Sequence, residues 1–162
     1  MTAQTAMQKT VPKAKSEALR LLAEVGIEDD IVVKIHKTTA SALGQYRGAS
    51  QFRSGTTFWI SPDVPAVLVR EGIAASMLED VIVDTILHEY GHVLWEFLRI
   101  RSHLNPKAER LWEDVRALST GSEDDDEEGF AENFGLAVSG REQSPVHLAF
   151  ARRFGELLKE DR

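Results

Sequence analysis

The chain has 162 residues, 43% of them hydrophobic and 28% charged, which is typical of one folded domain with an apolar core. The absence of cysteine excludes disulfides and thiolate metal ligands, and the net charge of −7 disfavours a phosphate backbone, so we expect no nucleic-acid partner. No apolar stretch is long enough to span a bilayer, and the N-terminus carries no apolar signal segment. We therefore expect no membrane partner and a cytoplasmic location.

The first part of the chain combines one helix with short extended segments. Residues 1–12 are polar and terminal, and we expect them to be disordered. Apolar residues at helical spacing over 13–25 predict a helix that ends at Gly26. Extended segments are predicted at residues 31–35, 43–47, 56–61 and 67–70.

The rest of the chain is predicted to be helical. Apolar residues surround the segment 74–99, which indicates a helix buried on several sides. Asn105 before Pro106 is typical of a helix start. Residues 121–126 form an acidic loop, and the acidic side chains up to position 127 are interpreted as solvated. Further helices are predicted at residues 126–139 and 145–159. Strands that come early and helices that come late favour an α+β fold, a single domain over 13–162.

The buried helix contains the sequence His-Glu-Tyr-Gly-His at residues 88–92. His88 and His92 are four positions apart, so they share one helix face and can bind the same zinc ion. Glu89 lies about 100° further round the helix, where it can reach a metal-bound water without binding the metal. Zinc lowers the pKa of such a water towards about 7, and a nearby carboxylate accepts its proton. The motif therefore predicts a zinc site with Glu89 as general base.

A purely structural explanation would make this segment a core helix with two hydrogen-bonded histidines. Three polar side chains inside an apolar helix are costly without partners. Gly91 adds about 1 kcal/mol, the cost of glycine in a helix interior. We interpret this combination as a place where function overrides local stability.

A catalytic zinc ion takes three protein ligands and keeps one position for water. Residue 98 is leucine, so the longer HExxHxxGxxH pattern is excluded. Glu128 and Glu132 are four positions apart on a predicted helix and share a face. One of them can bind the metal, while the other accepts the free ring N–H of a ligating histidine.

The motif HEYGH, followed by EGFAENF at residues 128–134, resembles the gluzincin metallopeptidases. It is most similar to the anthrax lethal factor type of catalytic domain, with HEFGH and EFFAEAF, and phage and mobile-element zincin-like peptidases share a similar glutamate helix. The resemblance covers residues 80–99 and 126–136. It implies a zincin-like fold, in which a short mixed sheet packs on the active-site helix and the glutamate-bearing helix lies behind it. It also implies Zn²⁺ as cofactor, Glu128 as third ligand and Glu132 as hydrogen-bond partner of a zinc-bound histidine.

Lethal factor-type enzymes place a tyrosine shortly before the glutamate helix to stabilise the oxyanion, whereas this chain has no tyrosine after Tyr90. A packing or surface role is the alternative for each substitute that the chain offers. The candidate stabilisers are Tyr46, His103 and His147. By the same resemblance, the strand at 56–61 would line the cleft and pair with an extended substrate.

The predicted function is zinc-dependent hydrolysis of a peptide bond, with a peptide or protein substrate as partner. Two alternatives remain open. A zinc-stabilised binding or regulatory module without turnover predicts metal-dependent folding and no cleavage. An amidase or other hydrolase would use the same water chemistry on a different substrate.

Overall fold

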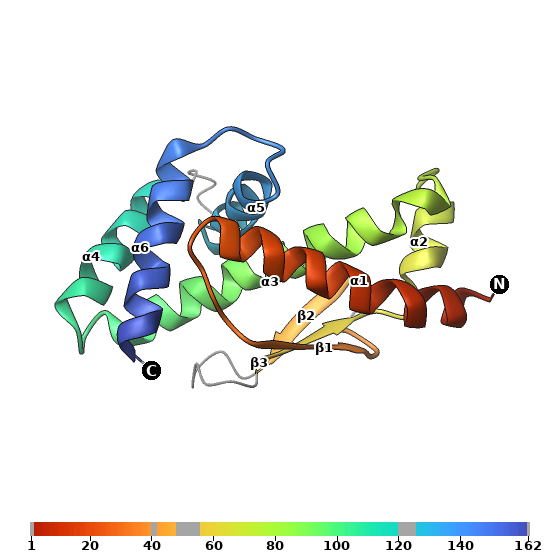
Figure 1. Ribbon diagram of the computed structural model, residues 1–162, viewed down its shortest axis with the longest axis horizontal. Helices are drawn as coiled ribbons and strands as arrows, with labels where there is room; N and C mark the ends of the chain where they lie inside the picture. The colour runs from red at the N-terminus through yellow and green to blue at the C-terminus, as the bar shows by residue number, and fades with distance from the viewer. Residues whose placement is uncertain (1, 40–41, 48–55, 120–125, 162) are drawn as a thin grey trace.

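The computed structural model describes residues 2–39, 42–47, 56–119 and 126–161 (Figure 1). These residues form six α-helices and a three-stranded mixed sheet, which confirms the α+β class. The elements in chain order are α1 (Ala3–Glu24), β1 (Ile31–Ile35), β2 (Gly44–Arg47), β3 (Thr56–Ile60), α2 (Val64–Arg70), the short 3₁₀ helix η2 (Ala75–Met77), α3 (Leu78–Arg101), α4 (Pro106–Leu118), α5 (Asp126–Val138) and α6 (Pro145–Asp161). Within the described segments, no helix combines the length and the apolar character needed to cross a bilayer.

The sheet has the strand order β1-β3-β2. β3 is parallel to β1, with Ile31 opposite Thr56, and antiparallel to β2, with Gly44 opposite Ile60. Both edges of β3 are therefore paired, and the expectation that the strand at 56–61 adds a substrate strand is wrong. Among the described strands, β2 is the one that both borders α3 and keeps an unpaired edge.

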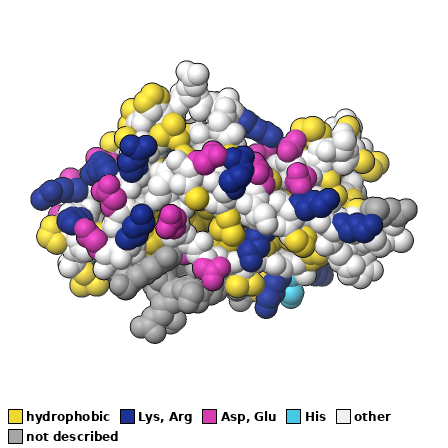
Figure 2. Space-filling view, viewed as in Figure 1, with side chains coloured by type: hydrophobic (Ala, Val, Ile, Leu, Met, Phe, Trp, Pro, Cys, Tyr) yellow, Lys and Arg dark blue, Asp and Glu magenta, His cyan; other side chains and the backbone are white. Residues whose placement is uncertain are grey.

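Helix α3 is the centre of the molecule. Figure 1 shows α1 and α5 lying against it on one side, the sheet on the other, α2 near its beginning, and α4 and α6 near its end. Eleven of its residues are buried, among them Ile82, Ile86, Leu94 and Phe97. This burial confirms the prediction of a helix surrounded by apolar contacts. On the outside, basic and acidic side chains are interspersed over the face seen in Figure 2.

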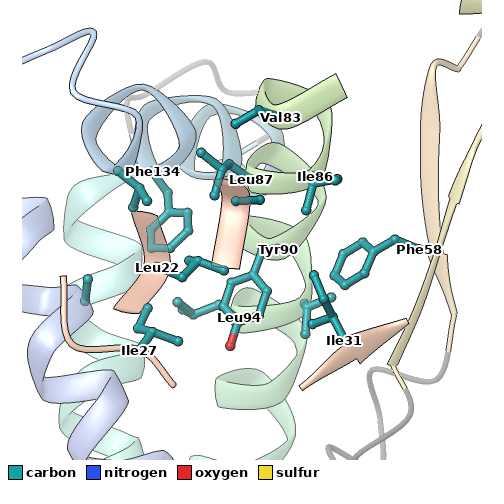
Figure 3. Packing of buried hydrophobic residues seen from close by; sticks show 14 of the residues in the cluster. Leu22, Ile27, Ile31, Phe58, Val83, Ile86, Leu87, Tyr90, Leu94 and Phe134 are labelled. Atoms are coloured by element: carbon teal, nitrogen blue, oxygen red, sulfur yellow. The ribbon is translucent and has the colours of Figure 1, made fainter. Parts of the chain in front are cut away.

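Tyr90 joins three parts of this core. Its ring lies between Phe58 of β3 and Phe134 of α5, with centroid distances of 6.4 and 6.3 Å (Figure 3). Its hydroxyl donates a hydrogen bond of 2.8 Å to Oδ2 of Asp29, in the segment between α1 and β1. The buried hydroxyl group of Tyr90 therefore has a hydrogen-bond partner, as buried polar groups in protein cores generally do.

Helix α1 begins much earlier than predicted. Residues 3–12 belong to it, so the expectation of a disordered N-terminus at 1–12 is wrong. Met7 and Val11 are buried, and they extend the apolar stripe of Ala14, Ala18 and Leu22 along the same face. The polar residues between them obscured this spacing in the sequence.

One other difference concerns a short segment. Residues 67–70, predicted to be extended, lie in α2, whose Val64 and Leu68 are buried one turn apart. Pro65 stands in the first turn of α2, where its fixed φ favours helix initiation. The acidic loop predicted at 121–126 lies outside the described residues except for Asp126, the first residue of α5.

Candidate metal centre

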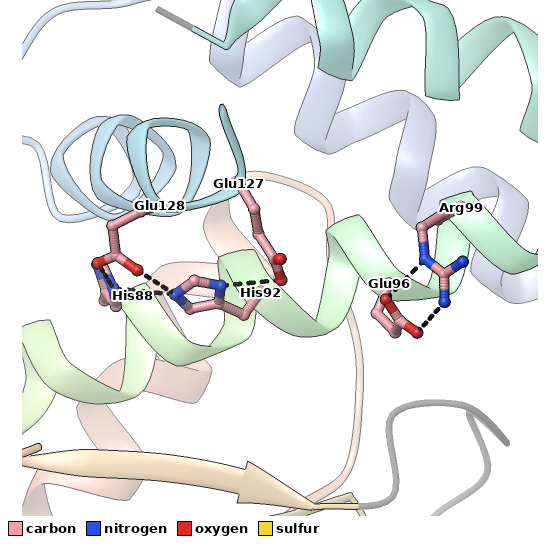
Figure 4. Close-up of polar contacts among 6 residues, drawn as sticks. All are labelled: His88, His92, Glu96, Arg99, Glu127 and Glu128. Atoms are coloured by element: carbon pink, nitrogen blue, oxygen red, sulfur yellow. Dashed lines mark hydrogen bonds and ion pairs between the residues drawn. The ribbon is translucent and has the colours of Figure 1, made fainter. Parts of the chain in front are cut away.

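Three predicted ligands lie together at the crossing of α3 and α5 (Figure 4). Nε2 of His88 is 2.7 Å from Oε1 of Glu128, and Nε2 of His92 is 3.0 Å from the other carboxylate oxygen. The two Nε2 atoms are 3.2 Å apart. The three side chains could therefore hold one metal ion. Two imidazoles and one carboxylate form a donor set that zinc accepts at sites with one free position.

Glycines at the helix crossing explain why these side chains meet. A Cβ atom on Gly91 would lie 2.7 Å from Cα of Ala131 in α5. A Cβ atom on Gly135 of α5 would lie 3.4 Å from the backbone nitrogen of His88. The two backbones approach closely here, and this brings Glu128 over the histidines. Gly91 therefore has a packing role, which the interpretation from the sequence did not include.

The free ring nitrogen of His92 also has a carboxylate partner, Glu127. Nδ1 of His92 lies 3.1 Å from Oε1 of Glu127. Metal-binding histidines commonly donate their other N–H in this way, which fixes the ring orientation. The resemblance to gluzincins implied this role for Glu132, and the sequence analysis interpreted Glu127 as solvated. Glu132 lines the same pocket but makes no hydrogen bond to either histidine in the described part of the chain.

The protein environment shifts the pKa values of the two histidines in opposite directions. Burial lowers the pKa of His88, and Glu128 opposes this effect only in part. Burial also acts to lower the pKa of His92, but the hydrogen bond that its ring donates to Glu127 and the charges of Glu89 and Glu128 outweigh this effect, so the net change in the pKa is upward. A lowered pKa favours the neutral imidazole that a metal requires.

Glu89 lies in the wall of the same pocket. Burial raises its pKa to about 7; His92 opposes the shift, whereas Glu128 and Glu127 add to it. A carboxylate with a pKa near the working pH can both accept and return a proton, which is the property of a general acid–base group.

The pocket has a volume of about 510 Å³ and lies between α3, α5 and the edge strand β2. Ala42, Leu43 and Gly44 form the wall on the strand side. A Cβ atom on Gly44 would overlap the side chain of Thr85, so only glycine lets β2 lie directly on α3. The edge of β2 that no described strand pairs with therefore runs beside the ligand cluster.

Of the three candidate oxyanion stabilisers, Tyr46 is the one that the structure places beside the ligands. Its ring stacks on His92 with a centroid distance of 6.3 Å and an interplanar angle of 23°. Burial, together with Glu127, Glu96 and Glu89, raises its pKa to about 12, so the hydroxyl keeps its proton. The other two lie elsewhere: His103 is exposed in the turn after α3, and His147 of α6 lies against Phe130 and contacts Ser144.

No protein-family model matches the chain, and comparisons with curated proteins and with solved structures likewise give no match. The resemblance to gluzincins therefore rests on the two motifs and on the cluster that they form.

Proposed function

We propose that the protein is a zinc-dependent metallopeptidase. The observation that carries this proposal is the position of Glu89 in the wall of the pocket that also contains His88, His92 and Glu128. A bound zinc ion would supply Lewis-acid polarisation of the scissile carbonyl and acidify a water. Glu89 accepts a proton from the attacking water while the water oxygen bonds to the carbonyl carbon. Glu89 then gives this proton to the leaving amine as the C–N bond breaks.

Two further groups have roles in this proposal. The hydroxyl of Tyr46 is protonated and donates a hydrogen bond to the developing oxyanion. Leu43, just before β2, accepts a hydrogen bond from the backbone N–H of Ser61, just after β3. The alternation of an antiparallel ladder therefore turns the backbone N–H and C=O groups of Gly44 and Tyr46 towards the edge of β2 that no described strand pairs with. An extended peptide would pair with these groups and lie across the ligand cluster.

A second candidate is a zinc-stabilised module without turnover. The ligands come from two helices, α3 and α5, so a metal ion would link them and add to the stability of the fold. This candidate shares the metal site with the first and differs in the role of Glu89.

Metal analysis combined with Glu89→Gln separates the two candidates. We expect one zinc ion per wild-type chain, lost in His88→Ala and Glu128→Ala, and retained in Glu89→Gln. Glu89→Gln should lower cleavage of a mixed peptide library by about 10²- to 10⁴-fold, the usual contribution of a general base. Glu113→Gln, an equal charge change on the exposed face of α4, should leave cleavage unchanged.

Zinc binding without cleavage in the wild type would favour the structural module. Full activity in Glu89→Gln would remove Glu89 as base. No zinc after purification and reconstitution would contradict both candidates.

A further inference from the structure

The pocket continues beyond the ligand cluster towards the beginning of α3. Asp84 lies one turn before His88 on α3, and Glu132 lies one turn after Glu128 on α5; one turn is about 5.4 Å. Both carboxylates line the pocket. A side chain of a peptide bound at the cluster would therefore reach them when extended along the two helices.

The walls of this extension are largely apolar. Val81 of α3 and Leu136 of α5 line it, with Gly135 between the two helices. An aliphatic chain would pack on these residues and leave its end at the carboxylates. Long cationic side chains bury their methylene groups in this way while the charged end meets polar partners.

The charged side chains that line the pocket are acidic. The described residues that line it include Asp84, Glu89, Glu128 and Glu132 but no lysine or arginine. A divalent ion at the cluster would balance Glu128 and Glu89, which leaves two carboxylates. Asp84 is paired with Arg141 at 2.6 Å, and Arg141 approaches it from outside this pocket. One negative charge thus remains without a matching cation.

The carboxylates of Glu132 and Asp84 differ in the ion-pair partners that they already have and in their burial. In the described structure Glu132 has no ion-pair partner and its side chain is exposed at the rim. Asp84 is half-buried; burial raises its pKa, Arg141 acts to lower it, and the charge of Asp80 adds to the rise. Arg141 alone does not fully compensate the Asp84 carboxylate, so a second cation inside the pocket would stabilise it further.

We infer that this extension is a specificity subsite for a lysine or arginine side chain of the peptide substrate, held by Glu132 and Asp84. The inference rests on the proposed peptidase function, because it assigns the residue next to the scissile bond. A substrate with an aliphatic side chain of equal length would fill the same space and lose the ionic contacts.

Fragment binding tests the subsite without relying on catalysis. Nα-acetyl-lysine methylamide and Nα-acetyl-norleucine methylamide have similar length, and only the first is charged. We would titrate each into the ¹⁵N-labelled full chain, metal-free and zinc-loaded, and follow the amide signals of Val81, Thr85, Gly135 and Leu136. The lysine compound should bind about five- to tenfold more tightly at low salt, and the ratio should shrink as ionic strength rises.

Variants assign the effect to named carboxylates. Glu132→Gln, on the exposed rim, should reduce the ratio to about twofold or less, and Asp84→Asn should reduce it in part. Glu113→Gln should leave it unchanged. Equal or tighter binding of the norleucine compound, shifts outside the pocket, or no shift at all would overturn the subsite.

Cleavage of the peptide library is measured in parallel. Enrichment of lysine and arginine beside the cut bond, lost in Glu132→Gln, is the expected result, and indifference to charge at that position would overturn the inference. A protein that binds the lysine fragment in the pocket but takes up no zinc, or cleaves nothing, would refute the peptidase proposal while the cationic site remained.

Discussion

Replacing Gly91 by alanine tests whether the crossing of α3 and α5 sets the geometry of the ligand cluster. The new Cβ atom would lie 2.7 Å from Cα of Ala131 and 3.1 Å from its Cβ. An ordinary contact is about 3.4 Å or more, so the backbone of α5 must move by roughly 0.7 Å. Such overpacking costs about 1–3 kcal/mol. The gain in helix propensity, about 1 kcal/mol, offsets part of this cost.

Gly135→Ala is the matched control, because it has the same propensity gain at the same crossing. Its Cβ would lie 3.4 Å from the backbone of His88, an ordinary contact. We expect Gly91→Ala to be destabilised by about 1 kcal/mol and Gly135→Ala to be stabilised by up to about 1 kcal/mol.

Urea unfolding followed by tryptophan fluorescence would measure both changes, since the chain has three tryptophans. Zinc affinity should fall at least tenfold in Gly91→Ala, because Glu128 moves with α5. Equal stability and equal zinc affinity in the two variants would refute the role given to the crossing.

Three further predictions concern single side chains. Tyr90→Phe removes the hydrogen bond to Asp29 and should lower the free energy of unfolding by about 1–2 kcal/mol in urea titrations, whereas an unchanged midpoint would show that the bond contributes nothing. Burial lowers the pKa of His147 below its ordinary 6.5, and the charge of Glu142 opposes this shift only in part. The unfolded chain therefore binds the proton more readily than the folded chain, so the free energy of unfolding should fall as the pH drops below about 6.5. In His147→Gln, urea titrations should show a smaller fall over the same pH range. Tyr46→Phe should keep its zinc and lower kcat about a hundredfold, and full activity would remove Tyr46 as oxyanion donor.

Features that depend on local spacing could be predicted from the sequence. The buried helix, the shared face of His88 and His92, and the start at Asn105 follow from periodicity and capping, and the structure contains them. The side-chain oxygen of Asn105 accepts a hydrogen bond from the backbone N–H of Lys107, as an N-cap residue does. The position of Glu128 came from the motif resemblance, and the structure brings this residue to the histidines.

Features that depend on how helices cross could not be predicted in the same way. Glu127 belongs to a run of acidic residues, and only the angle of α5 over α3 turns it towards His92. The close approach at Gly91 is likewise a property of two helices rather than of one pattern. The free edge of β2 follows from the strand order, which the alternation within a strand does not determine.

The central position of α3 has a consequence for how the pocket can adapt to a ligand. Helix α3 is enclosed by α1, α5 and the sheet, so we expect the amides of its central turns to exchange with solvent more slowly than those of the edge strand β2. The floor that carries His88 and His92 is therefore the most rigid part of the site. Strand β2 has a single neighbour in the sheet and otherwise rests on α3 at Gly44, so fewer backbone hydrogen bonds hold it in place than hold the central strand β3. Adjustment to ligands of different size would fall to this strand, and the distance between the two histidines would stay constant.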